Sequence, residues 1–228
     1  MGRGALMWVM LLAAPLAAAQ PRPGSVRGEV RVLAPGPDGR LVPRTDASEV
    51  VVYLTGYTEP PPPEEVTVAQ RNKTFEPAVL AIVAGQKVRF SNNDTVVHNV
   101  FSRSRASKFD AGKNRPGEVY TQGFNKPGIV DLYCDIHEKM VSTLVVVPNR
   151  AFAITGPEGH FVLGAVPPGT WSLFAVHRRD ERSDVSRAEV TVKPGEATQV
   201  KLELTETRAG DEHPDKHGQP YTPRSDAY

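Results

Sequence analysis

The 228-residue sequence contains a single cysteine, which excludes a disulfide within the chain and a zinc site built from several cysteines. It also lacks an excess of charge of one sign, because 27 Lys and Arg residues balance 26 Asp and Glu residues. This balance argues against a protein that binds nucleic acid or another polyanion. Sustained helical periodicity is missing from the chain beyond its N-terminal residues 1–20. What is present, 21 prolines and 19 glycines between valine-rich runs, is typical of a globular β protein.

The N-terminus carries a short apolar run, Ala5 to Ala14, which follows the basic residue Arg3. Small residues at 17–19 then offer a cleavage site, and the run is too short to span a bilayer. We therefore predict a signal peptide over residues 1–19, cleaved near Ala19, rather than a retained membrane anchor. The protein is expected to be periplasmic or secreted, without stable membrane insertion.

Short alternating or valine-rich segments, bounded by Gly, Pro and Asn, predict strands along the rest of the chain. Four consecutive prolines occupy residues 60–63. They favour extended backbone without hydrogen-bond donors, so they are expected to form a stiff linker rather than a ligand for a proline-recognising module. The strand rhythm after the prolines suggests a sandwich or barrel. The predicted organisation is a first group of strands in 24–58, the linker in 59–65, a second β domain in 66–148, further strands in 149–205 and a disordered tail in 206–228.

The segment richest in chemistry is YCDIHEKM, from Tyr133 to Met140. Cys134, His137 and Met140 place a thiolate, an imidazole and a thioether within seven residues, a soft ligand set that suits copper. His98 offers a second imidazole from a strand-like run upstream. Three of the four methionines leave with the predicted signal peptide, so Met140 remains as the single Met beside the single Cys. Cysteine and two histidines in a plane with a weak axial methionine form the blue-copper electron-transfer arrangement.

Each of these residues also has an ordinary alternative role. A buried cysteine is commonly a small hydrophobe, a histidine in a strand is commonly a structural residue, and a methionine after a turn commonly belongs to the core. Zinc competes with copper, although methionine is a poor zinc ligand. A cysteine nucleophile paired with a histidine needs an electropositive niche and an oxyanion site, and nothing in the sequence marks either.

The motifs His98-Asn99-Val100-Phe101 and Cys134-x-x-His137-x-x-Met140 resemble the ligand motifs of type 1 blue-copper cupredoxins. The short His-to-Met spacing is similar to amicyanin and tighter than in plastocyanin. The lead-in Val79–Phe90 and the turn Asn92-Asn93-Asp94 also resemble the cupredoxin strand-turn-strand before the first ligand. Roughly residues 66–148 are similar to cupredoxin domains in proteins labelled methylamine-utilisation-like.

The resemblance implies a Greek-key β-sandwich that binds one mononuclear type 1 copper through His98, Cys134, His137 and Met140. It also implies that Asn99 ties the ligand loops together and that His137 lies near the surface beside an apolar patch. The implied function is an exported carrier of single electrons between redox partners, with no enzymatic activity. Two alternatives stay open: a copper-binding or delivery protein, and a non-redox binding scaffold with a vestigial copper motif. A basic loop around residues 103–115 is suited to steering an acidic redox partner, or is simply a solvated loop.

The flanking segments, Gly28–Gly56 and Gly159–Trp171, resemble carboxypeptidase-regulatory-like domains, which are small prealbumin-like sandwiches. Their opening strands precede the cupredoxin region and the remainder follows it. We therefore expect an all-β fold, with a cupredoxin Greek-key sandwich inserted in, or followed by, a prealbumin-like or Ig-like sandwich. Trp171 is expected to be a core residue of that sandwich.

Overall fold

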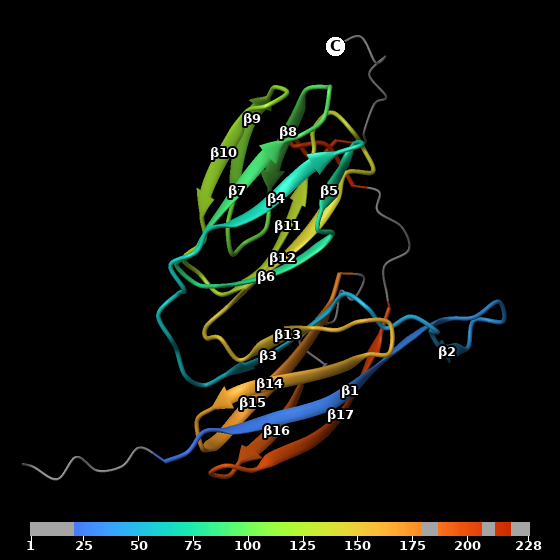
Figure 1. Cartoon of the computed structure of the whole chain (residues 1–228). Coiled ribbons are helices and arrows are strands. Elements are labelled where there is room, and N and C mark those ends of the chain that lie inside the picture. The colour runs from blue at the N-terminus through green and yellow to red at the C-terminus, as the bar shows by residue number, and fades with distance from the viewer. Residues whose placement is uncertain (1–20, 179–186, 207–212, 220–228) are drawn as a thin grey trace, which may run out of the picture.

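The computed structural model describes residues 21–178, 187–206 and 213–219. Within these ranges the secondary structure consists of seventeen β-strands (Figure 1). The predicted all-β fold is confirmed. No helix that is long and apolar enough to cross a membrane occurs in the part of the chain that the structure describes. The predicted signal peptide lies outside the described residues.

Strands from both ends of the chain form one sandwich, here called the terminal sandwich (Figure 1). One sheet has the order β14-β1-β17, with β2 paired to β1, and the other has the order β13-β3-β15-β16. Strand β1 runs parallel to β17, in register from Ser25 opposite Ala197 to Leu33 opposite Thr205. Its strands are β1 (Gly24–Pro35), β2 (Leu41–Pro43), β3 (Val50–Thr55), β13 (Phe152–Ile154), β14 (His160–Val166), β15 (Gly169–His177), β16 (Arg187–Val192) and β17 (Ala197–Thr205).

The continuous middle of the chain forms a second sandwich, here called the central sandwich. One sheet has the order β10-β7-β4-β5 and the other the order β6-β12-β11-β8-β9. Its strands are β4 (Val66–Arg71), β5 (Thr74–Glu76), β6 (Val79–Val83), β7 (Lys87–Asn92), β8 (His98–Ser102), β9 (Phe109–Asn114), β10 (Val119–Gly123), β11 (Gly128–Tyr133) and β12 (Val141–Val147).

A third apolar layer, the middle layer, joins the two sandwiches face to face. Successive side chains of a strand point to opposite faces, so Leu144 of β12 enters the core of the central sandwich whereas Val145 faces the terminal sandwich. In β3, Val50 and Val51 divide in the same way. These strands are buried on both faces, which explains their uninterrupted valine runs. The buried residues of the middle layer are Val51, Val79, Ala81, Val83, Val145, Val147 and Val176.

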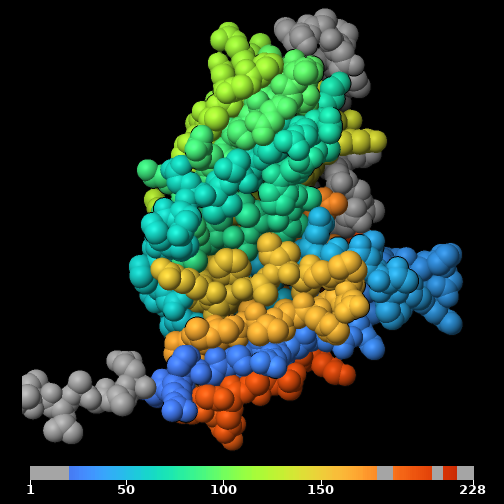
Figure 2. All heavy atoms as spheres, in the orientation of Figure 1, coloured from blue at the N-terminus to red at the C-terminus, as the bar shows by residue number. Residues whose placement is uncertain are grey.

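The chain passes between the sandwiches twice, once from β3 to β4 and once from β12 to β13, and these two connecting segments lie side by side. The Glu59 backbone N–H donates to the carbonyl of Pro148 at 3.1 Å, and the Glu59 carboxylate accepts from the backbone N–H of Arg150 at 2.6 Å. Further along, the Gln86 side-chain amide donates to the carbonyl of Glu64 at 3.0 Å. The proline segment is thus hydrogen-bonded to neighbouring chain near both of its ends, and Figure 2 shows the sandwiches in contact on the face in view. The predicted domain boundaries, and the relation of the terminal sandwich to carboxypeptidase-regulatory-like domains, stay predictions.

Trp171 packs against the core of the terminal sandwich and is half-buried. Its ring lies 4.7 Å from that of Tyr57, and its indole N–H donates to the carbonyl of Pro167 at 2.8 Å.

Residues 213–219, here called the C-terminal segment, pack on the central sandwich. The His213 ring is buried and lies 4.4 Å from the Tyr133 ring and 6.2 Å from the Phe101 ring. The Lys216 ammonium lies 3.1 Å from a carboxylate oxygen of Asp110 and 3.7 Å from one of Asp135. We expected disorder throughout 206–228, but these described residues make specific contacts; residues 207–212 and 220–228 lie outside the described part.

Candidate metal centre

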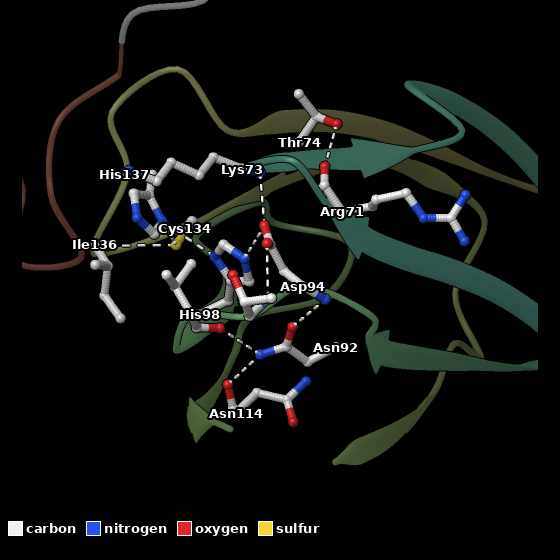
Figure 3. A network of polar contacts seen from close by, with 12 residues as sticks. Arg71, Lys73, Thr74, Asn92, Asp94, His98, Asn114, Cys134, Ile136 and His137 are labelled. Carbon is white, nitrogen blue, oxygen red and sulfur yellow. Dashed lines mark hydrogen bonds and ion pairs between the residues drawn. The ribbon is translucent and has the colours of Figure 1, made fainter. Parts of the chain in front are cut away.

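A closed loop between β11 and β12 carries three of the predicted ligands. Cys134 follows the last residue of β11, and Met140 precedes the first residue of β12. The backbone N–H of Cys134 donates to the carbonyl of Met140 at 3.2 Å, and the N–H of Met140 donates to the carbonyl of His137 at 3.1 Å. The Ile136 N–H points at the Cys134 sulfur from 3.4 Å. These bonds fix the loop so that the cysteine and histidine side chains face the same side (Figure 3).

Strand β8 brings His98 to the same point. The Nδ1 atoms of His98 and His137 are 3.1 Å apart, and the Cys134 sulfur is 3.7 Å from His137 Nδ1. The three donor atoms all lie within 4.8 Å of one another, an arrangement that fits a shared metal ion (Figure 3). His98 and Cys134 are fully buried, and His137 is half-buried. Met140 is fully buried in the same core cluster as Cys134, and its assignment as a ligand stays a prediction.

The protonation chemistry of the donors suits a metal ion. Burial lowers the pKa of His98, although the neighbouring Asp94 opposes this shift, so the imidazole is neutral near pH 7 and keeps a lone pair. Burial raises the pKa of the Cys134 thiol, and a bound cation reverses this by stabilising the thiolate. A raised thiol pKa also disfavours Cys134 as a nucleophile. One thiolate and two imidazoles form a soft donor set that fits copper.

Asn99 links the two ligand-bearing segments. Its side-chain oxygen accepts a hydrogen bond from the backbone N–H of Asp135 at 3.3 Å. Its side-chain nitrogen donates to the Asp110 carboxylate at 2.7 Å and to the Gly112 carbonyl at 2.8 Å. Asn99 follows His98, and Asp135 follows Cys134, so one side chain holds both segments at a fixed separation. Its influence on a bound metal stays a prediction.

One residue at the centre was missed by the sequence analysis. Asp94 places a carboxylate oxygen 3.0 Å from Nε2 of His98, on the side of the ring opposite the other donors (Figure 3). The sequence signal was present, because Asp94 precedes His98 by four residues in the turn after β7. By sequence alone, that turn indicates only the lead-in to the first ligand.

The centre is partly open to solvent at one edge. Ile136 and His137 are both half-buried. Within the predicted basic loop around residues 103–115, Asp110 pairs with Lys216 of the C-terminal segment, and Arg115 lies 3.9 Å from the carboxylate of Glu118.

Comparison with known proteins places this centre in a family. Residues 64–147 match the family model described as copper binding proteins, plastocyanin/azurin family. A plastocyanin from Cucurbita pepo is 36% identical over 75 residues, in an alignment that covers 28% of this chain and 76% of that protein. The chain belongs to the plastocyanin/azurin copper-binding family. The predicted resemblance to cupredoxins and the predicted copper cofactor are thereby confirmed.

Two further proteins are similar to part of this chain. A chloroplastic plastocyanin from Tetradesmus obliquus is 32% identical over 83 residues, which covers 32% of this chain and 57% of that protein. The crystal structure of amicyanin from Paracoccus versutus is 23% identical, with a TM-score of 0.35, and the match covers 42% of this chain and 97% of amicyanin.

Proposed function

We propose that this chain carries single electrons through one copper ion bound by His98, Cys134 and His137, with Met140 as a weaker fourth donor. The observation that supports this best is the convergence of two imidazole nitrogens and one sulfur within 4.8 Å, in a chain of a copper-binding family. A copper ion in this donor set supplies one-electron chemistry, because it alternates between two oxidation states. No catalytic turnover is proposed.

The surrounding residues favour electron transfer because they restrain the donors. His98 and Cys134 are excluded from water, and the loop bonds of Cys134 and Met140 limit how far the donors can move. A site that changes little between two oxidation states exchanges electrons with a small reorganisation cost. The half-buried ring of His137, next to Ile136, is the donor nearest to solvent. We therefore propose this edge as the place where electrons enter and leave.

The proposed partner is another redox protein, met in the periplasm or outside the cell. The location depends on the predicted signal peptide. Exposed basic side chains of the loop that joins β8 to β9, including Arg103, Arg105 and Lys108, favour a partner with an acidic surface, because complementary charge raises the rate of encounter.

Absorption spectroscopy of the purified protein with added Cu(II) tests the proposal. The wild type should develop an intense visible band from thiolate-to-copper charge transfer, and Cys134→Ser should abolish it. His137→Gln should weaken or shift the band, whereas His160→Gln, which alters an exposed histidine of the terminal sandwich, should leave it unchanged.

Absence of the band in the wild type, or its survival in Cys134→Ser, would contradict the proposed centre. Voltammetry then separates carrier from delivery protein. A reversible one-electron wave supports the carrier, whereas copper that leaves the protein readily on reduction supports delivery.

A further inference from the structure

The buried imidazole of His98 touches a carboxylate on the side facing away from the other donors. Asp94 Oδ2 lies 3.0 Å from His98 Nε2, while His98 Nδ1 lies 3.1 Å from His137 Nδ1 (Figure 3). The His98 side chain is 0% exposed and the Asp94 side chain is 13% exposed. The contact is therefore shielded from water. A charge acts more strongly in such a buried place than at the surface.

The position of the Asp94 carboxylate is fixed by the backbone and does not depend on His98. The backbone N–H of Lys73 donates to Oδ2 at 2.8 Å, and the N–H of Thr95 donates to Oδ1 at 2.8 Å. The Asn92 side chain accepts from the Asp94 N–H at 3.0 Å and donates to the carbonyl of Val96 at 2.9 Å, which fixes the turn itself. Both oxygens of the carboxylate therefore act as acceptors toward backbone N–H groups.

This arrangement determines which ring nitrogen of His98 bears the proton. Asp94 Oδ2 already accepts from the Lys73 N–H, so it presents an acceptor to His98, and Nε2 is the donor of this contact. In a neutral imidazole the other nitrogen then carries a lone pair. That nitrogen, Nδ1, faces His137 and Cys134, which is the orientation a metal ligand requires.

We propose that Asp94 is a positioning residue of the copper centre, which holds His98 in the tautomer with Nδ1 free to bind the metal and lowers the reduction potential of the site. The first effect follows from the hydrogen bond. The second follows from charge, because a nearby anion and a more basic imidazole stabilise the oxidised ion more than the reduced one. The proposal rests on the proposed copper function and adds a residue outside the predicted ligand set.

Two substitutions separate the two effects in the full-length protein. Asp94→Asn keeps a hydrogen-bond acceptor but removes the charge, so the reduction potential should rise while the Nε2–H tautomer and the visible band persist. Asp94→Ala removes both, so the potential should rise, the His98 tautomer should no longer be fixed, and copper affinity should fall by about 10–100-fold. Glu118→Gln, at an exposed carboxylate paired with Arg115, is the control and should change none of these.

Proton–nitrogen correlation spectra of the histidine rings, recorded on metal-free and Cu(I)-loaded protein, give the tautomer, and voltammetry gives the potential. A wild-type His98 with its proton on Nδ1 overturns the positioning role. An Asp94→Asn potential equal to that of the wild type overturns the electrostatic role. If Asp94→Ala fails to fold, Asp94→Asn still decides the electrostatic role and the wild-type spectrum the positioning role. A wild type without the visible band refutes the proposed function instead, and the tautomer is still measurable without metal.

Discussion

Met140 is the predicted ligand whose role is least tied to the donor cluster. Its side chain is fully buried in the core of the central sandwich, and the hydrogen bonds of its backbone close the ligand loop. A methionine can fill such a position by packing alone, and it can also act as a weak axial donor. The two roles lead to different results on substitution.

Met140→Leu should leave the visible copper band in place and raise the reduction potential, because removal of a weak donor disfavours the oxidised ion. Leucine conserves the volume, so the free energy of unfolding should fall by less than about 1.5 kcal/mol. Voltammetry and urea unfolding measure the two effects. An unchanged potential would assign Met140 to packing only.

Asn99→Ala should loosen the centre by cutting the link between the His98 and Cys134 segments. It removes an acceptor for Asp135 and two donated hydrogen bonds. The expected cost in unfolding free energy is about 1–3 kcal/mol, because buried groups lose their partners. Copper loss to a chelator should also become faster.

Asn149→Ala is a matched control for this substitution. Asn149 is equally buried, and it bonds to Leu54, Tyr57 and Ala151 of the terminal sandwich. This variant should lose similar stability and keep the wild-type rate of copper loss. If both variants release copper at the same rate, the effect at Asn99 is general destabilisation.

The sequence was sufficient to bring together His98, Cys134 and His137, because unusual residue types at fixed spacing carry chemical information. Asp94 was missed for a physical reason. Aspartate is common in turns, where it bonds to nearby backbone, and such bonds are present here from Thr95 and Lys73. Only the folded turn shows that the same carboxylate also reaches a buried imidazole.

At the scale of elements, strands were predicted well because alternation and valine runs report burial directly. The C-terminal segment was not, because it has no periodicity. Its contacts depend on single side chains, the His213 ring and the Lys216 ammonium, which meet groups far away in sequence. Contacts of this kind leave no local pattern.

Lys216→Met should remove the ion pairs that hold the C-terminal segment to Asp110 and Asp135. The Lys216 side chain is 31% exposed, so the loss in unfolding free energy should be less than about 1 kcal/mol. Amide hydrogen exchange should nevertheless become faster in residues 134–140, because only the backbone hydrogen bond from residue 216 to Asp135, at 3.1 Å, would still hold the segment against the ligand loop. Lys193→Met, in the turn between β16 and β17, is the control. Equal exchange in both variants would show that the segment does not restrain the ligand loop.

At the scale of the whole molecule, the middle layer makes the two sandwiches dependent on each other. Val145→Asp should place a charge between them, where no water can solvate it, and should cost several kcal/mol. We expect the wild type to unfold in one transition and this variant in two, as followed by near-ultraviolet circular dichroism. Val162→Asp, at a site on β14 that is 57% exposed, should change stability by less than about 0.5 kcal/mol. Separate transitions in the wild type would contradict the coupling.

Cleavage within the proline segment should leave the protein intact under native conditions. β1 and β3 are hydrogen-bonded to β14, β15 and β17, so the N-terminal fragment is held by two sheets. A protease site inserted at 59–65, followed by size-exclusion chromatography, should yield one peak that contains both fragments. Free separation of residues 20–58 would refute the shared sandwich.

The parallel pairing of β1 with β17 has a consequence for the order in which the chain is completed during translation. The central sandwich is continuous in sequence, so every strand it requires has been synthesised once Val147 leaves the ribosome. β1 is made first, yet it must wait for the last strand, from Ala197 onward, before both of its edges are paired. A premature stop codon just before β17 would therefore release a protein with an assembled copper centre and an exposed sheet edge, which is a template for aggregation.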